Sequence, residues 1–327
     1  MSIESQTRIS LFNLLKQLKE QSAALPAEVN TALTELNATA KQIGLGLYAL
    51  GSYDKARFHL TIAGAAGDVE SQYAMATCET RLDGGFRLVS EATAKWLRLA
   101  AAQDHIPALL RLGDSESLAR ARTLATTPPL ADTPSAQRCL YTLTNDVQWL
   151  KKAADQGDIA AIYELKDAYA KRPELIPNRL ERQALIVELT QRAADRGYPK
   201  AVYELAFTTD EAVSVEEKQK RIIQLAMMGQ LDGLLEYAYA LAGLSQDKNR
   251  VHRTYGLERN LPKACALLKL VLTKVDGALP LPSVEDDYQA IKHQMQDTAE
   301  SDIILAQLRG TITRVFQVLE PLVILGW

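Results

Sequence analysis

Small and large apolar residues recur at steps of four along the middle of the chain. In the stretch WLKKAADQGDIAAIYEL, residues 149–165, this spacing places Trp149, Ala153, Gly157, Ala161 and Leu165 in one series. Steps of four keep side chains on one face of a helix. Glycine can end a helix in the left-handed conformation without a Cβ clash. The series therefore predicts two antiparallel helices that meet closely at small residues on either side of Gly157.

The same series returns in four other stretches, so that the chain contains a repeat array. With the residue at the turn taken as origin, the five copies are centred on Gly67, Asp104, Gly157, Gly197 and Gly229, which lie 37, 53, 40 and 32 residues apart. The longest interval indicates an insertion. Each copy has a residue pair just before the turn: Ala63-Gly64, Ala100-Ala101, Ala153-Ala154, Ala193-Ala194 and Leu225-Ala226. We expect Ala153 and Ala193 to be buried where two helices touch, and Asp158 to begin a second helix.

This pattern resembles the Sel1-like repeat, a relative of the tetratricopeptide repeat, over residues 50–275. The likeness includes glycine followed by an apolar residue between copies, as in Gly85-Phe86 ahead of Trp96 and in Gly256-Leu257 ahead of a degenerate sixth copy. Asp104 departs from the pattern because it replaces glycine, and only two copies keep a tryptophan. The resemblance implies an all-α fold, an α-solenoid of stacked antiparallel helix pairs with helical caps at both ends.

The ends of the chain complete this organisation. We expect residues 1–50 to form an N-terminal helical cap from two helices, over 2–24 and 26–50, followed by the repeat array at 51–275. The breaker-rich stretch TTPPLADTPSA, 126–136, is a candidate joint within the array. Residues 276–327 are predicted to be a linker and a C-terminal capping helix in ESDIILAQLRGTITRVFQVLE. Two helices per copy plus the caps predict about fourteen helices.

Charge and composition narrow the classes of partner. The formal charge is −3 and no excess of Lys and Arg is clustered in the sequence. The sequence therefore does not predict binding to nucleic acid or to an anionic membrane, which requires such a cluster. One basic loop carries Lys248, Arg250, Arg253 and Arg259. A solvated loop is the simpler interpretation, with an anion contact as the alternative. The charged N-terminal stretch does not read as a secretory signal, and the apolar C-terminal stretch is too short to cross a bilayer. Three separated cysteines suit buried thiols, so we expect a cytoplasmic location.

The sequence offers no recognisable catalytic or metal-binding motif. The four histidines (His59, His105, His252, His293) lie apart from one another and from every cysteine, and the spacings of zinc sites, phosphate loops and nucleophile elbows are missing. His59 occupies the position that tryptophan takes in other copies, which favours a packed imidazole. We therefore expect no catalytic residue, no cofactor and no metal. Carboxylates from distant copies leave an enzyme, or an enzyme-regulating domain with a site in the solenoid groove, as the alternative.

The leading hypothesis is a non-enzymatic protein-interaction module, an adaptor or scaffold that binds a protein through the curved surface of the array. Resemblance to bacterial Sel1-like proteins implies a more specific hypothesis, in which the chain is an immunity protein that neutralises a secreted toxin. Its partner would then be a toxin or a secretion-system component. Polar residues outside the series are the candidate partner-binding residues: Lys151, Lys152, Gln191 and Arg192. No nucleic-acid partner and no membrane insertion are expected.

Overall fold

The computed structural model describes residues 3–21, 25–82, 89–210, 213–244 and 255–319, and in these ranges the chain is built from α-helices. Seventeen α-helices are present in the described residues, together with a single isolated β-bridge. The predicted all-α, solenoid-type fold is thus confirmed. None of the described helices has the length and apolar character that spanning a bilayer requires. The chain falls into two compact units, which divide between Gln156 and Gly157.

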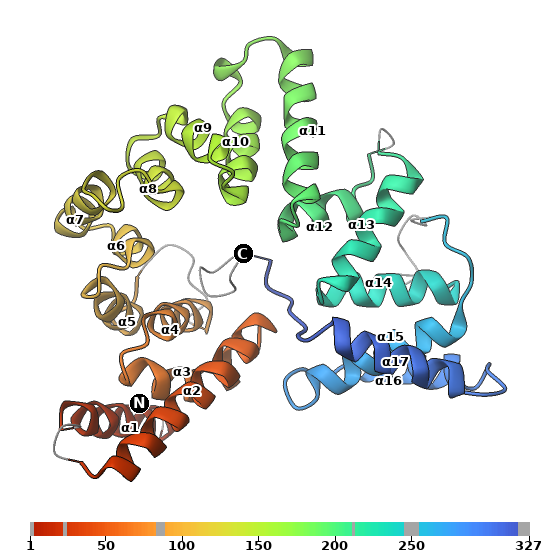
Figure 1. The fold of residues 1–327 in the computed structure, drawn as a ribbon, viewed down its shortest axis with the longest axis horizontal. Helices are drawn as coiled ribbons and strands as arrows, with labels where there is room; N and C mark the ends of the chain where they lie inside the picture. The colour runs from red at the N-terminus through yellow and green to blue at the C-terminus, as the bar shows by residue number, and fades with distance from the viewer. Residues whose placement is uncertain (1–2, 22–24, 83–88, 211–212, 245–254, 320–327) are drawn as a thin grey trace. The chain divides into compact units, whose positions relative to one another are not determined.

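The first unit contains nine helices in its described part (Figure 1). They are α1 (Ile3–Glu20), α2 (Ala27–Ala49), α3 (Tyr53–Ala65), α4 (Val69–Leu82), α5 (Glu91–Ala101), α6 (Ile106–Leu112), α7 (Ser115–Thr126), α8 (Pro134–Thr144) and α9 (Val147–Asp155). From α2 to α9 each helix packs on the next one along the chain, while α1 packs against α3. The two helices predicted before residue 51 are therefore present as α1 and α2, apart from residues 2 and 22–24, which lie outside the described residues.

The second unit contains eight α-helices in its described part. They are α10 (Ile159–Lys171), α11 (Arg179–Asp195), α12 (Pro199–Phe207), α13 (Val215–Met227), α14 (Leu231–Ala242), α15 (Leu261–Val275), α16 (Pro282–Lys292) and α17 (Ala299–Thr311), with a short 3-10 helix, η2, at Pro173–Leu175. Consecutive helices from α10 to α15 pack on one another, and both α16 and α17 pack on α15 (Figure 1).

All five predicted turn positions adopt the left-handed backbone conformation. The φ angles are +96° at Gly67, +60° at Asp104, +89° at Gly157, +80° at Gly197 and +86° at Gly229. Asp104 is the one non-glycine member, and aspartate tolerates this conformation better than most residues. Its carboxylate also accepts a hydrogen bond of 2.8 Å from Arg120 Nε. The turn is therefore a fixed element of the copy even where glycine is replaced.

The small residues of the series are packed as predicted. Ala153 and Ala193 are both 0% exposed. At Gly64, an added Cβ would lie 2.8 Å from the ring of Trp96, so the indole in α5 packs directly on the α3 backbone. The second helix also begins where predicted, because Asp158 Oδ1 accepts a hydrogen bond of 2.6 Å from the Ala161 backbone N–H at the start of α10.

The fifth copy reverses the sizes of the two residues that flank the turn. Four copies have alanine four residues before the turn, whereas this copy has Leu225. The residue four positions after the turn is Gly233, and an added Cβ there would lie 2.7 Å from Leu225 Cγ. The large residue of α13 therefore fills the space that a side chain on α14 would otherwise occupy. This shows that the two positions face each other across the helix pair.

Three expectations about helix number and placement were wrong. The prediction of about fourteen helices was too low because α7 and α8 fill the insertion between the second and third copies, where no four-residue series marks them. The stretch expected to be a linker after residue 275 contains α16. The final helix ends at Thr311, earlier than predicted, and the chain then continues in extended form.

The candidate joint at 126–136 connects α7 and α8 inside the first unit, and the division between the units comes later, within the third copy. Of the basic loop, Lys248, Arg250 and Arg253 lie outside the described residues. Arg259 is described, and its Nη2 donates a hydrogen bond of 2.8 Å to Gln294 Oε1.

Candidate protein-interaction site

The predicted partner-binding residues lie on two helices, one in each unit. Lys151 and Lys152 belong to α9, whereas Gln191 and Arg192 belong to α11. Lys152 is exposed, and its ammonium nitrogen lies 4.4 Å from the centre of the Trp149 ring, within cation–π range. Lys151 is partly exposed. The structure thus pairs the residues along each helix, and the two pairs belong to different units.

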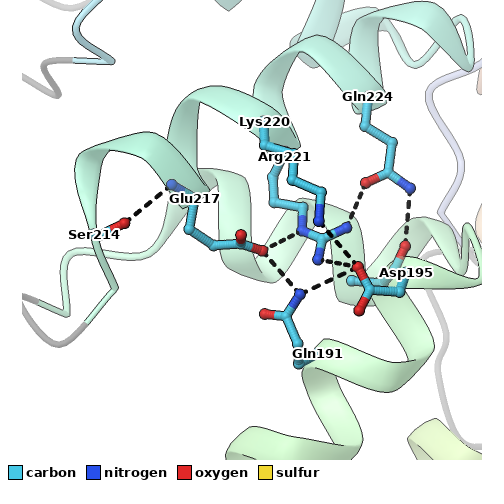
Figure 2. A network of polar contacts seen from close by, with 8 residues as sticks. Gln191, Asp195, Ser214, Glu217, Lys220, Arg221 and Gln224 are labelled. Atoms are coloured by element: carbon cyan, nitrogen blue, oxygen red, sulfur yellow. Dashed lines mark hydrogen bonds and ion pairs between the residues drawn. The ribbon is translucent and has the colours of Figure 1, made fainter.

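Gln191 has a structural role that its position in the sequence did not reveal. Its side-chain amide donates to Glu217 Oε1 at 2.9 Å and to Asp195 Oδ1 at 3.3 Å (Figure 2). Glu217 belongs to α13, so this amide connects α11 of the fourth copy with α13 of the fifth. Its neighbour Arg192 is partly buried and also has a polar or ring contact. We call the contact between α11 and α13 the seam; its residues are Gln191, Asp195, Glu217, Arg221 and Gln224. Gln191 therefore contributes to the seam, in addition to any contact with a partner.

A fully buried arginine, Arg221, is the centre of this seam (Figure 2). Its Nε donates to Glu217 Oε1 at 2.6 Å, its Nη1 to Gln224 Oε1 at 2.7 Å and its Nη2 to Asp195 Oδ1 at 2.6 Å. A guanidinium can be buried when its donors are used in this way, since an unpaired buried charge is costly. Gln224 completes the connection because its amide donates to the Ala194 carbonyl at 2.8 Å.

Local helix geometry positions the acidic partners of Arg221. Ser214 is the N-cap of α13, and its Oγ accepts a hydrogen bond from the Glu217 backbone N–H at 3.2 Å. Glu217 thus lies in the first turn of α13, one helical turn before Arg221. Asp195 is the last residue of α11, where the Gly197 turn ends the helix and brings its carboxylate to the next copy.

The exposed edge of the network is formed by Asp195 and Lys220, whose side chains are 48% and 58% exposed. Lys220 Nζ lies 3.2 Å from Asp195 Oδ1. The hydrogen bond from Arg221 lowers the pKa of the Asp195 carboxyl below its ordinary value, and Lys220 and Gln191 act in the same direction. Asp195 therefore carries its charge at neutral pH, and the surface of this seam presents a carboxylate beside an ammonium group.

The sequence contained a signal for Arg221 that our interpretation missed. Arg221 lies eight residues before the Gly229 turn, the position that Trp96, Trp149 and Leu189 take in their own copies. A charged residue at a position that is apolar in three of the other four copies, with His59 in the fourth, indicates a buried ion pair or hydrogen-bond network.

A second buried cation lies between α10 and α12. Lys166 is 7% exposed, and its Nζ lies 2.9 Å from Glu204 Oε2 and 3.0 Å from Asp167 Oδ1. Tyr163 donates a hydrogen bond of 2.9 Å from its hydroxyl to the same Glu204 oxygen. Burial disfavours the charged form of Lys166, but the two carboxylates outweigh it and raise the pKa of this lysine above its ordinary value. The amine is thus held protonated, which is unsuited to a nucleophile or a base.

Metal binding and thiol chemistry depend on how His, Cys, Asp and Glu side chains are grouped and buried. Among the described residues, no group of three or more His, Cys, Asp or Glu side chains is placed to hold a metal ion. Cys78, Cys139 and Cys265 are buried free thiols. Burial raises the pKa of Cys78 and Cys265, and it raises the pKa of Cys139 to about 11. A raised pKa disfavours the reactive thiolate.

No family model and no curated protein matches this chain. Two similar solved structures are helical-repeat proteins. One is a protective antigen of uropathogenic Escherichia coli strains that displays an SLR fold, with 15% identity, a TM-score of 0.41 and coverage of 90% of this chain and 64% of the other. The other is a Sel1 repeat protein from Oxalobacter formigenes, with 18% identity, a TM-score of 0.32 and coverage of 82% and 96%. This chain thus spans about 64% of the length of the first structure. Both are Sel1-repeat structures.

Proposed function

We propose that this chain is a non-enzymatic protein-interaction module that holds a protein partner on the polar side chains of its helices. One observation carries the proposal: the small residues of the series are buried, as at Ala153 and Ala193, while positions outside the series differ between copies. Repeat proteins use this separation to keep one packing scheme while each copy presents its own surface.

The surface chemistry favours a partner with an acidic patch. On α9 the proposal uses Lys151 and Lys152, and on α11 it uses Arg192. Gln191 contributes less, because its amide already donates to two carboxylates in the seam. Charges around an interface control the rate of encounter and the choice of partner more than the stability of the fold.

The test reverses charge at the three basic residues together, as Lys151→Glu, Lys152→Glu and Arg192→Glu. Lys151 and Lys152 are surface charges, which contribute about 0–1 kcal/mol to stability, whereas Arg192 is partly buried and has a contact of its own. Thermal unfolding followed by circular dichroism should therefore change little in the double lysine variant, and any larger change in the triple variant measures the contact of Arg192. Capture of partners by the tagged full chain, identified by mass spectrometry, should fall.

The matched control reverses three other exposed basic residues, Lys171, Arg179 and Arg309. Capture should then stay at the level of the unmodified chain. Equal capture by the first triple variant and the unmodified chain would place the binding surface elsewhere. Equal loss in both triple variants would indicate an effect of overall charge.

Neutralisation of a secreted toxin is the finer form of this proposal, and its support is the resemblance to bacterial Sel1-like proteins. If a neighbouring gene encodes a toxin, co-expression of this chain with that toxin should restore growth of a sensitive host, and the triple variant should restore it less. A cytoplasmic location belongs to the same proposal and is tested by cell fractionation.

The alternative is an enzyme or an enzyme-regulating domain. Turnover of a small molecule by the purified chain would replace the binding-module proposal, since binding alone would then no longer account for its activity. Incubation of the chain with a metabolite mixture, followed by mass spectrometry, measures this directly.

A further inference from the structure

The chain beyond α17 lies extended against the turn between α13 and α14. The Phe316 backbone N–H donates to the Gly229 carbonyl at 2.9 Å, and the Leu231 N–H donates to the Phe316 carbonyl at 2.7 Å. These two hydrogen bonds form the parallel bridge between Gln230 and Phe316. The extended segment thus binds the α13–α14 helix pair through the Gly229 carbonyl and the Leu231 N–H, two main-chain groups of the turn.

Three apolar side chains anchor this segment. Ile312, Val315 and Phe316 are 1%, 6% and 1% exposed, whereas the intervening Thr313 and Arg314 are exposed. The segment is also held by its backbone, because Lys274 Nζ donates a hydrogen bond of 3.1 Å to the Thr313 carbonyl. The buried residues of this segment are thus apolar and spaced at i, i+3 and i+4.

Glycine is required at this turn for a second reason besides its φ angle of +86°. A Cβ at Gly229 would overlap the carbonyl oxygen of Arg314 and lie 3.2 Å from Ile312 Cγ2. The absence of a side chain thus allows the extended segment to approach the turn closely.

At three of the other four turns, one of the two equivalent main-chain groups is occupied by a side chain or is missing. At two turns the side chain that precedes the next turn covers the carbonyl: Gln103 Nε2 donates to Gly67 O at 3.1 Å, and Arg196 Nη1 donates to Gly157 O at 3.1 Å. After Gly197, the residue equivalent to Leu231 is Pro199, which has no backbone N–H to donate.

We propose that the Gly229–Leu231 turn is a peptide-binding site, and that residues 312–319 occupy it as an internal ligand. A partner protein would replace them with an extended segment that has apolar residues at the spacing of Ile312, Val315 and Phe316. Main-chain hydrogen bonds of this kind form with any sequence, while pockets for apolar side chains give specificity. This inference uses none of the basic residues of the proposed function, so each can fail without the other.

The first test uses the intact chain and a synthetic peptide of residues 311–319, TITRVFQVL. Excess peptide should speed hydrogen exchange at the Phe316 amide, because the internal segment is displaced, while the Leu231 amide stays protected by the incoming peptide. A peptide with alanine in place of its phenylalanine is the matched control and should change neither amide. Unchanged exchange at Phe316 with the original peptide would overturn the proposal.

The second test weakens the internal ligand in the full chain by Phe316→Ala. In a fluorescence anisotropy titration, labelled peptide should bind this variant at least about tenfold more tightly than the unmodified chain, in which the tethered segment competes at high effective concentration. Adding Gly229→Ala should abolish binding, with circular dichroism melts to confirm folding. Equal affinity for all three proteins would overturn the proposal, and so would failure of the peptide to bind a folded Phe316→Ala variant.

Discussion

The reversed pair Leu225 and Gly233 gives the most direct test of how the helices of one copy meet. Restoring the alanines found in most other copies requires Leu225→Ala and Gly233→Ala. Leu225 is 0% exposed, so its truncation alone should cost about 2–5 kcal/mol through lost contacts and a cavity. Gly233→Ala alone places a Cβ 2.7 Å from Leu225 Cγ. The overpacking should cost about 1–3 kcal/mol, partly offset by about 1 kcal/mol of helix propensity.

The two changes should compensate each other when combined. Truncation of Leu225 removes the 2.7 Å contact with Cγ and leaves a contact of 3.0 Å with the Cβ of residue 225, so the clash is largely relieved and the new methyl group of residue 233 enters part of the vacated space. We therefore expect the double variant to be about 1–3 kcal/mol more stable than the sum of the single effects predicts. Urea unfolding of the four proteins, followed by far-ultraviolet circular dichroism, supplies the four free energies of this cycle.

A matched control combines Gly233→Ala with Ile162→Ala, another truncation at a 0% exposed position, two copies earlier in the chain. That pair should be additive within about 0.5 kcal/mol. If Leu225→Ala and Gly233→Ala were equally additive, the two positions would not face each other, and the proposed role of the four-residue series in packing would be refuted.

Three further predictions concern the seam and the tryptophans. Arg221→Ala should lower the free energy of unfolding by about 1–3 kcal/mol, because it opens a cavity and removes hydrogen bonds from Glu217 and Asp195, whose side chains are 25% and 48% exposed; Arg221→Leu, which fills the space, should cost less in the same urea titration. Asp195 has a lowered pKa, so its contribution to stability is present above about pH 4 and is lost as pH falls through its folded-state pKa; Asp195→Asn should flatten the fall in melting temperature between about pH 5 and pH 2. Trp96→Ala should cost about 3–5 kcal/mol because the ring is only 5% exposed, and Trp149→Ala, at a partly exposed position, should cost less.

Periodicity predicted the fold because packing imposes the same demands in every copy. Burial of Ala153 and Ala193 followed from their steps of four, and the left-handed turn followed from glycine at a fixed position. Where the chain has no repeated packing contact, the helices were not predicted. Helices α7 and α8 carry no series, so nothing in the sequence distinguished their residues from a long insertion.

The candidate site was less predictable, because polar residues at equivalent positions can have opposite roles. Gln191 and Lys151 each lie six residues before their turn. The first donates to carboxylates of the seam, whereas the second remains a surface residue of α9. What distinguishes them is the residue on the facing copy, and in the case of Gln191 that residue is Glu217. Long-range contacts of this kind cannot be read from the spacing within one copy.

The C-terminal segment illustrates the same point at the level of the backbone. Helical periodicity predicted that the last helix would continue toward residue 320, yet it ends at Thr311. The residues that follow, Ile312, Val315 and Phe316, satisfy helical spacing as well as the three-anchor spacing that the extended segment uses. The outcome depends on the partner that the turn at Gly229 offers: a carbonyl, an N–H two residues later and no Cβ between them. A repeat array thus provides, at one of its turns, main-chain groups that select an extended conformation over a helical one.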